Sequence, residues 1–164
     1  MIESNGFSGL TPAQATIIRY WRSRCENGRA PHRHDIDPGV LRSHLSAISI
    51  VEVEPDGGVR FRLAGSAVRG VFGQEMRGRR LDEFDGPAAD MWSLGLTSVL
   101  ERQRPVGGII KRQDDYHAWL RLPLRPTATG YMVLCHDMLI PAERYAPRPV
   151  QSSPRSDRFG PLAA

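Results

Sequence analysis

The chain has 164 residues, which is enough for one ordinary domain and too few for two of comfortable size. Hydrophobic residues make up 40% of it and charged residues 24%, which excludes a mostly disordered chain, a collagen-like chain and a membrane-embedded one. With 22 basic and 18 acidic residues the formal net charge is +4, which permits nucleic-acid binding without requiring it.

The two cysteines, Cys25 and Cys135, are too few for a disulfide framework, and neither has a metal-binding or redox spacing. Free cysteines fit a reducing compartment. The N-terminus lacks the basic-then-apolar stretch of a signal peptide, and no apolar run approaches the roughly 18 residues of a membrane helix. We therefore expect a cytoplasmic protein with no membrane segment.

After an N-terminal extension of residues 1–11, the sequence predicts an amphipathic helix over 12–26. Thr11 is a capping residue, Pro12 suits the first helical position, and Gln14 completes a capping box. Apolar side chains then recur at helical spacing, at Ala13, Ile17, Tyr20 and Trp21. Asn27-Gly28 ends the helix, and a turn-rich linker completes the region 12–36.

A second capping signal, Asp37-Pro38, predicts a short helix that ends near residue 45. The period then changes to that of strands, and Ile48 and Ile50 indicate a strand over about 46–54. The turn residues 55–58 predict a hairpin.

The second strand of this hairpin alternates in character. Its apolar residues are Val59, Phe61 and Leu63, and its basic residues are Arg60 and Arg62. Such alternation predicts a half-buried strand with one apolar and one polar face.

Two further helices are expected before the next strands. A short one over 65–72 points Val68, Val71 and Phe72 inward and closes at Gly73. A longer one spans about 87–103, with a buried stripe that includes Trp92, and Pro105 prevents its continuation.

Three strands follow, over about 106–114, 117–125 and 130–139, separated by tight polar turns. Residues 131–135 are apolar on both faces, which is typical of a strand covered on both sides. The segment 141–164 is rich in Pro, Arg and Ser, and its composition predicts a flexible tail.

The order of helix, two strands, short helices and three strands predicts an α+β fold: a five-stranded antiparallel sheet with inserted helices and a leading amphipathic helix. Residues 37–140 form the expected domain. Eight motifs carry a resemblance to a known family: Tyr20-Trp21-Arg22, Gly28-Arg29-Ala30-Pro31, Asp35-Ile36-Asp37-Pro38, Phe61-Arg62-Leu63-Ala64-Gly65-Ser66-Ala67, Phe72-Gly73, Gly78-Arg79-Arg80-Leu81, Arg104-Pro105-Val106 and Leu122-Pro123-Leu124. Over about 13–140 the chain thereby resembles the alphaproteobacterial single-domain PAS proteins. The resemblance implies a PAS fold with a role in signalling and cell-cycle regulation, without catalysis.

PAS folds enclose a cavity between sheet and helices, and four residues are candidates to line a ligand pocket there: Arg62, Trp92, Tyr116 and His117. Two interpretations of Arg62 remain open. It forms a salt bridge or carbonyl contact that fastens its strand, or it receives an anionic ligand. Core packing is the alternative for Trp92.

Both faces of the last strands are apolar, so each needs a cover. The inserted helices cover one face. We expect the N-terminal helix to cover the other, within the chain or exchanged in a homodimer. The candidate dimer or partner residues are Ile17, Tyr20, Trp21 and Trp119. Trp119 alternates with Leu120 and Leu122, so we expect it on the opposite sheet face, against helix 12–26 or a partner subunit.

Other site chemistry has weaker support in the sequence. His32 and His34 with Asp35 and Asp37 offer metal ligands, but Asp37 is more simply a helix cap, so no metal site is predicted. No phosphate-binding glycine loop or nucleophile motif is present, so no enzyme is predicted. An isolated histidine, His44, His117 or His136, leaves a haem ligand conceivable.

Three functional hypotheses follow. The first is a non-catalytic, cytoplasmic PAS-type sensory or protein-interaction module, homodimeric, which binds a small ligand and protein partners. The second is a haem- or flavin-binding sensor, although no cofactor is required by the sequence. The third is a nucleic-acid-associated regulator, the less favoured reading of the basic run Arg19, Arg22, Arg24, Arg29 and Arg33.

Overall fold

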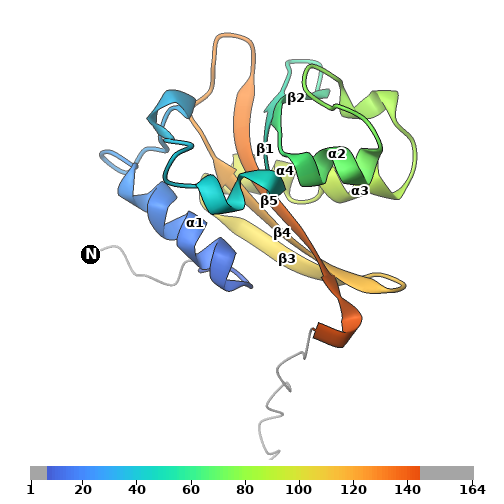
Figure 1. The fold of residues 1–164 in the computed structure, drawn as a ribbon. Helices are drawn as coiled ribbons and strands as arrows, with labels where there is room; N and C mark the ends of the chain where they lie inside the picture. The colour runs from blue at the N-terminus through green and yellow to red at the C-terminus, as the bar shows by residue number, and fades with distance from the viewer. Residues whose placement is uncertain (1–6, 145–164) are drawn as a thin grey trace, which may run out of the picture.

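Five antiparallel strands form one sheet in the order β2-β1-β5-β4-β3 (Figure 1). The computed structural model describes residues 7–144. Its strands are β1 (Ile48–Val53), β2 (Val59–Ala64), β3 (Val106–Lys111), β4 (Asp115–Pro123) and β5 (Tyr131–Pro141). Its helices are α1 (Pro12–Ser23), α2 (Ser66–Phe72), α3 (Pro87–Ser93) and α4 (Leu96–Arg102). Short 3-10 helices are η1 (Arg33–Asp35), η2 (Arg42–Ala47), η3 (Leu81–Glu83) and η4 (Ala142–Arg144).

The sheet has two halves that meet at its centre. The hairpin β1–β2 forms one half, and the consecutive strands β3, β4 and β5 form the other. The halves join where β1 pairs with β5, while α2, α3 and α4 lie in the chain between β2 and β3. The predicted α+β class, with a five-stranded antiparallel sheet and inserted helices, is confirmed.

Helices cover both faces of the sheet, with α1 on one face and α2, α3 and α4 on the other (Figure 1). The buried residues on the α1 face include Ile17, Ile18, Trp21, Leu120, Leu122 and Leu134. The buried residues on the other face include Val51, Val68, Trp92, Val99, Val133 and Cys135. Neighbours along a strand point to opposite faces, so the central strands carry apolar residues on both faces, interrupted by a few buried polar side chains.

The first helix forms as its sequence predicts but ends three residues early, at Ser23. The side-chain oxygen of Thr11 accepts a hydrogen bond from the Gln14 amide at 3.1 Å, which caps the helix start. Beyond the helix, Asn27 and Gly28 have positive φ angles of 52° and 72°, and the chain doubles back there into a tight turn. The indole of Trp21 donates to the Pro123 carbonyl at 2.8 Å and ties α1 to β4.

The second strand departs from simple alternation. The register of β1 against β2 shifts between Ile50 and Val51, as a β-bulge does. As a result Phe61 packs in the core beneath the inserted helices, whereas Leu63 packs in the core on the α1 face. The prediction that both residues share one apolar face was wrong, because the extra residue reverses the alternation.

Two predicted helices differ in extent. The helix expected over 87–103 is two short helices, α3 and α4, broken at Gly95, whose φ is 72°. The helix expected from Pro38 to about residue 45 is instead the 3-10 helix η2, which begins at Arg42. Over 87–103 the sequence carries apolar periodicity, but the break depends on a tertiary contact, the close approach of the Trp119 ring to Gly95.

At both ends, ordered structure extends beyond the bounds predicted for the helix and the domain. Strand β5 continues to Pro141 and η4 follows it, so regular structure reaches four residues into the predicted tail. The rest of that tail, 145–164, and residues 1–6 of the predicted extension lie outside the described residues. Within the extension, Phe7 packs against the core on the α1 face.

Candidate functional site

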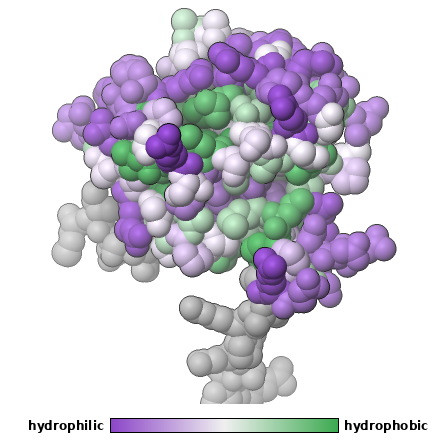
Figure 2. Space-filling model, in the orientation of Figure 1, coloured by the Kyte–Doolittle hydropathy of each residue, from purple (hydrophilic) through white to green (hydrophobic). Residues whose placement is uncertain are grey.

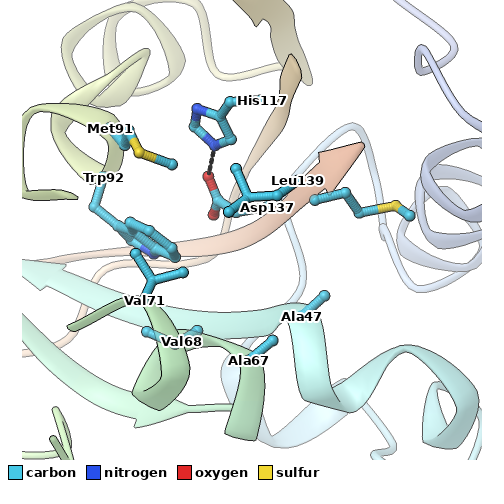
Figure 3. Close-up of a pocket in the computed structure, with 10 residues that line it drawn as sticks. Ala47, Ala67, Val68, Val71, Met91, Trp92, His117, Asp137 and Leu139 are labelled. Carbon is cyan, nitrogen blue, oxygen red and sulfur yellow. Dashed lines mark hydrogen bonds and ion pairs between the residues drawn. The ribbon is translucent and has the colours of Figure 1, made fainter. Parts of the chain in front are cut away.

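A cavity of about 290 Å³ lies between the sheet and the inserted helices (Figure 3). It is lined by Ala47, Ala67, Val68, Val71, Met91, Trp92, His117, Asp137, Met138 and Leu139. Helices α2 and α3 supply its apolar wall, and β4 and β5 supply a polar end. Its volume is just below the range of roughly 300–1,000 Å³ for small-molecule sites.

The apolar wall is held in place by core packing. Val68 of α2 is fully buried, and Trp92 of α3 is 2% exposed. The Trp92 indole N–H donates to the Ser49 hydroxyl of β1 at 3.1 Å, so the ring has a fixed orientation. Its ring also stacks on that of His117, with centroids 6.3 Å apart.

The polar end consists of three buried charged or titratable side chains. His117 Nε2 lies 2.7 Å from Asp137 Oδ1. Arg121 donates to both carboxylate oxygens of Asp137, at 3.0 and 3.1 Å. A carboxylate only accepts, so His117 donates from Nε2. Its other ring nitrogen, Nδ1, is buried and has no hydrogen-bond partner among residues 7–144.

Arg121 joins this polar end to the break between α3 and α4. It is fully buried and donates to the backbone carbonyls of Met91 at 3.1 Å and of Leu94 at 2.9 Å. Its guanidinium also lies over the Trp119 ring, 5.6 Å from the centroid. Burial lowers the pKa of Arg121, but the facing Asp137 carboxylate outweighs it and the pKa is raised.

Sequence reasoning missed Arg121 and Asp137. A signal was available, because both charges interrupt apolar strands that are buried on both faces. In such a strand an ionic side chain must find a buried partner of opposite charge. The two strand positions are not opposite each other in the β4–β5 register, so spacing alone would not have paired them.

The structure brings together two of the four candidate pocket residues. Trp92 and His117 both line the cavity. Tyr116 does not line it, since it precedes His117 in β4 and neighbouring strand residues point to opposite faces. Arg62 lies outside the cavity, on the hairpin strand β2.

Arg62 forms the salt bridge that was one of its two predicted roles. Its guanidinium donates to Glu52 of β1 at 2.5 Å. Glu52 is 2% exposed and also accepts hydrogen bonds from the hydroxyls of Thr127 and Thr129. Burial raises the pKa of Glu52, but the hydrogen bonds from Thr129 and Arg62 outweigh it and hold the pKa below its ordinary value.

The candidate dimer residues make contacts within the same chain. Ile17 is 1% and Trp21 7% exposed, both against the sheet. The Tyr20 hydroxyl accepts from the Asp37 amide at 2.7 Å. Trp119 faces the inserted helices and not α1, where it contacts Gly95 and Gly108. The expected placement of Trp119 against helix 12–26 is thus corrected, and the homodimer itself stays a prediction.

Metal and thiol chemistry have little support in this part of the chain. No group of three or more His, Cys, Asp or Glu side chains within residues 7–144 could hold a metal ion. Asp35 accepts from the His32 amide and Asp37 from the Gly39 amide, so both act in local turns. Burial raises the pKa of the Cys135 thiol to about 12, which makes it a poor nucleophile.

The haem alternative has little support in the cavity, and the flavin alternative stays a prediction. His117 is the one histidine among its lining residues, and Asp137 occupies its Nε2. The other buried histidine, His136, precedes Asp137 in β5 and so faces the α1 side.

A five-stranded antiparallel sheet in this order, with helices inserted after the first hairpin and a cavity beneath them, defines a PAS-type fold. A family model described as PAS domain matches residues 10–127. The chain therefore belongs to the PAS domain family.

Among solved structures, the chain is similar to the PAS domain of the histidine kinase ThkA. The alignment covers 55% of this chain and 98% of that one, at 23% sequence identity and a TM-score of 0.37. No curated protein matches the sequence. Within residues 7–144, no helix has both the length and the apolar character needed to cross a membrane.

Proposed function

We propose that this protein is a non-catalytic sensory module that binds a small ligand in the cavity between sheet and helices. The observation that carries the proposal is the cavity itself, with apolar walls and a single polar end at His117 and Asp137. The ligand changes the population of conformations that protein partners recognise. A role in bacterial signalling or cell-cycle regulation, in the cytoplasm, belongs to the same proposal.

The proposed ligand is small and carries no net charge. The one acidic lining residue, Asp137, is paired with Arg121, so the Arg121 guanidinium is not free for an anionic ligand. An apolar or aromatic body would contact Val71, Met91 and Trp92. A hydroxyl or carbonyl would face the polar end. The lining contains no Ser, Thr, Cys or Lys side chain, which supports binding over covalent catalysis.

Dimerisation is a further part of the proposal. With α1 packed on its own sheet, a partner copy needs other apolar surface. Ile110 at the edge strand β3 is 42% exposed and Leu139 of β5 is 40% exposed. Both pair in register with His117 of β4, so they stand in one row on the same face of the sheet.

Native mass spectrometry of the freshly purified full chain tests both points. We expect a dimer of the 18.3 kDa chain, with a small molecule retained by each copy. The matched control is Ala47→Phe, which fills the cavity from η2 and should lose the extra mass while keeping the oligomer. A native mass equal to that of the polypeptide alone, and unchanged after denaturing extraction, would contradict a retained ligand. A monomer at micromolar concentration would contradict the dimer.

The nucleic-acid hypothesis has less support. Arg22 donates to the Phe7 carbonyl at 3.3 Å and Arg24 to the Asp35 carbonyl at 2.9 Å. Arg19 bonds to Thr16 on the same helix. These local contacts fit an ordinary solvated helix face, which favours the sensory proposal.

A further inference from the structure

Two adjoining depressions lie away from the ligand cavity, where the linker after α1 passes over the hairpin. The first is apolar and has a volume of about 170 Å³. Its lining residues are Arg33, Ile36, Pro38, Leu41, Leu45, Ile48, Ile50, Leu63 and Leu134. This volume has room for one large apolar side chain. We call it the apolar groove.

The apolar groove belongs to the sheet face opposite the ligand cavity. Ile48, Ile50 and Leu134 are in the core on the α1 face, not in the core beneath the inserted helices. Leu63 reaches this face because of the β-bulge between β1 and β2. The groove is therefore distinct from the proposed ligand site.

The second depression is basic. Arg33, Arg62, Leu63, Ala64, Glu75 and Arg77 line it, and its volume is about 450 Å³. Arg33 and Leu63 line both depressions, so the two form one continuous surface. Figure 2 shows hydrophobic surface bordered by hydrophilic residues on the face that carries η2 and α2.

The charges of the basic depression are not balanced internally. Arg62 is paired with Glu52, and Glu75 is paired with Arg69 at 3.3 Å. The guanidiniums of Arg33 and Arg77 have no acidic partner among residues 7–144, and both residues are exposed. Two free positive charges thus stand beside an apolar groove.

We propose that this surface binds an acidic peptide segment of another protein, which inserts one large apolar side chain into the apolar groove. Its carboxylates pair with Arg33 and Arg77, and guanidinium-to-carboxylate pairing supplies the orientation. The apolar side chain supplies most of the affinity, because charge pairs at an exposed rim contribute little each.

The protein's own C-terminal segment does not have this chemistry. Residues 145–164 carry three arginines against one aspartate, so the segment has the same sign as the basic depression. A segment with acidic residues around one leucine or phenylalanine has the opposite sign and the required side chain. Charge complementarity therefore favours a partner protein over this tail.

The test is a titration of the isotopically labelled full chain with three synthetic peptides, followed by amide NMR. The first is a nonapeptide of alternating Asp and Ser with a central Leu. The second replaces the Leu with Ser, and the third replaces each Asp with Lys. We expect shifts at Ile36, Leu41 and Leu63 with the first peptide, and at least tenfold weaker binding of both the second and the third.

Charge-reversed variants separate this surface from general attraction between basic and acidic molecules. The double variant Arg33→Glu, Arg77→Glu should weaken binding of the first peptide roughly tenfold. The matched control Arg102→Glu, Arg104→Glu makes the same change of net charge at exposed positions elsewhere and should bind as the parent does. The amide spectrum of each variant reports that it is folded.

Three outcomes would overturn the proposal: no shifts at millimolar peptide, shifts that spare the apolar groove, or equal weakening by both double variants. Self-association that disappears in Arg33→Glu, Arg77→Glu would assign the surface to a second copy instead. Tighter binding of a DNA oligomer at the same residues would assign it to nucleic acid. None of these results bears on the ligand cavity.

Discussion

At the scale of single residues, the most consequential side chain is Arg121. A buried guanidinium is costly unless it is paired and fully hydrogen-bonded. Here Asp137 neutralises it, and the carbonyls of Met91, Leu94 and Leu120 accept its remaining N–H groups. The same carboxylate orients His117, so the polar end of the cavity and the position of the helices above it depend on one ionic cluster.

A second buried residue, His136, makes the stability of the protein depend on pH. Burial lowers its pKa from 6.5 to about 4, and the neighbouring His44 adds to this effect while Asp137 opposes it. The unfolded chain therefore takes up a proton before the folded one does. Stability is complete above pH 6.5 and decreases as the pH falls toward 4.

Between pH 7.5 and pH 5, this histidine should reduce the free energy of unfolding by about 2 kcal/mol, at 1.36 kcal/mol per pH unit below 6.5. The variant His136→Gln should lose correspondingly less over that interval. Urea denaturation at the two pH values measures the difference. The control is His34→Gln, whose imidazole is 79% exposed. A pH dependence identical in parent and His136→Gln would contradict the assignment.

At the scale of elements, the break between α3 and α4 sets the shape of the helical cover. Gly95 has a φ of 72°, and a Cβ built on it would lie 2.3 Å from a ring carbon of Trp119. Glycine is thus required twice, for its conformation and for the close approach of an aromatic ring. With a continuous helix over 87–103, the carbonyl of Leu94 would not be available to Arg121.

Substitution Gly95→Ala should destabilise the protein more than the same change at Gly28. Gly28 has the same φ of 72°, but its Cβ would meet nothing within 4 Å. Gly28→Ala should therefore cost about 1 kcal/mol for the backbone alone, and Gly95→Ala about 1–3 kcal/mol more for the displaced Trp119 ring. Chemical denaturation of both variants measures this difference. Equal decreases in the free energy of unfolding would show that the contact with the Trp119 ring does not contribute.

At the scale of the whole molecule, one sheet separates two proposed binding surfaces. The ligand cavity lies under the inserted helices, and the apolar groove lies on the α1 face. Strand β5 contributes Asp137 to the first and Leu134 to the second. A shift of this strand on ligand binding would reach both surfaces.

The element order was predictable from the sequence because it depends on local signals. The cap at Thr11, the turn at 55–58 and the alternating strands each act within a few residues. Two of the cavity residues, Trp92 and His117, were predictable for a related reason. They lie on elements whose order the PAS resemblance already fixes.

The remaining features depend on contacts between distant residues. The bulge that turns Leu63 to the α1 face, the break at Gly95 and the pairing of Arg121 with Asp137 are all tertiary effects. The hydrophobic periodicity and the capping signals along the chain carry no information about contacts between distant residues. These tertiary effects are also the features that shape the cavity and the apolar groove.

The most direct test of the ligand proposal compares two probes of similar shape and different charge. Methyl NMR of the full chain follows Val68, Val71 and Met91, which line the cavity, during titration with benzyl alcohol or with benzoate. We predict shifts of these methyl groups with the neutral alcohol, weaker or absent shifts with the anion, and none in Ala47→Phe. Methyl groups unmoved by millimolar benzyl alcohol, or moved more by benzoate, would contradict a cavity for small neutral ligands.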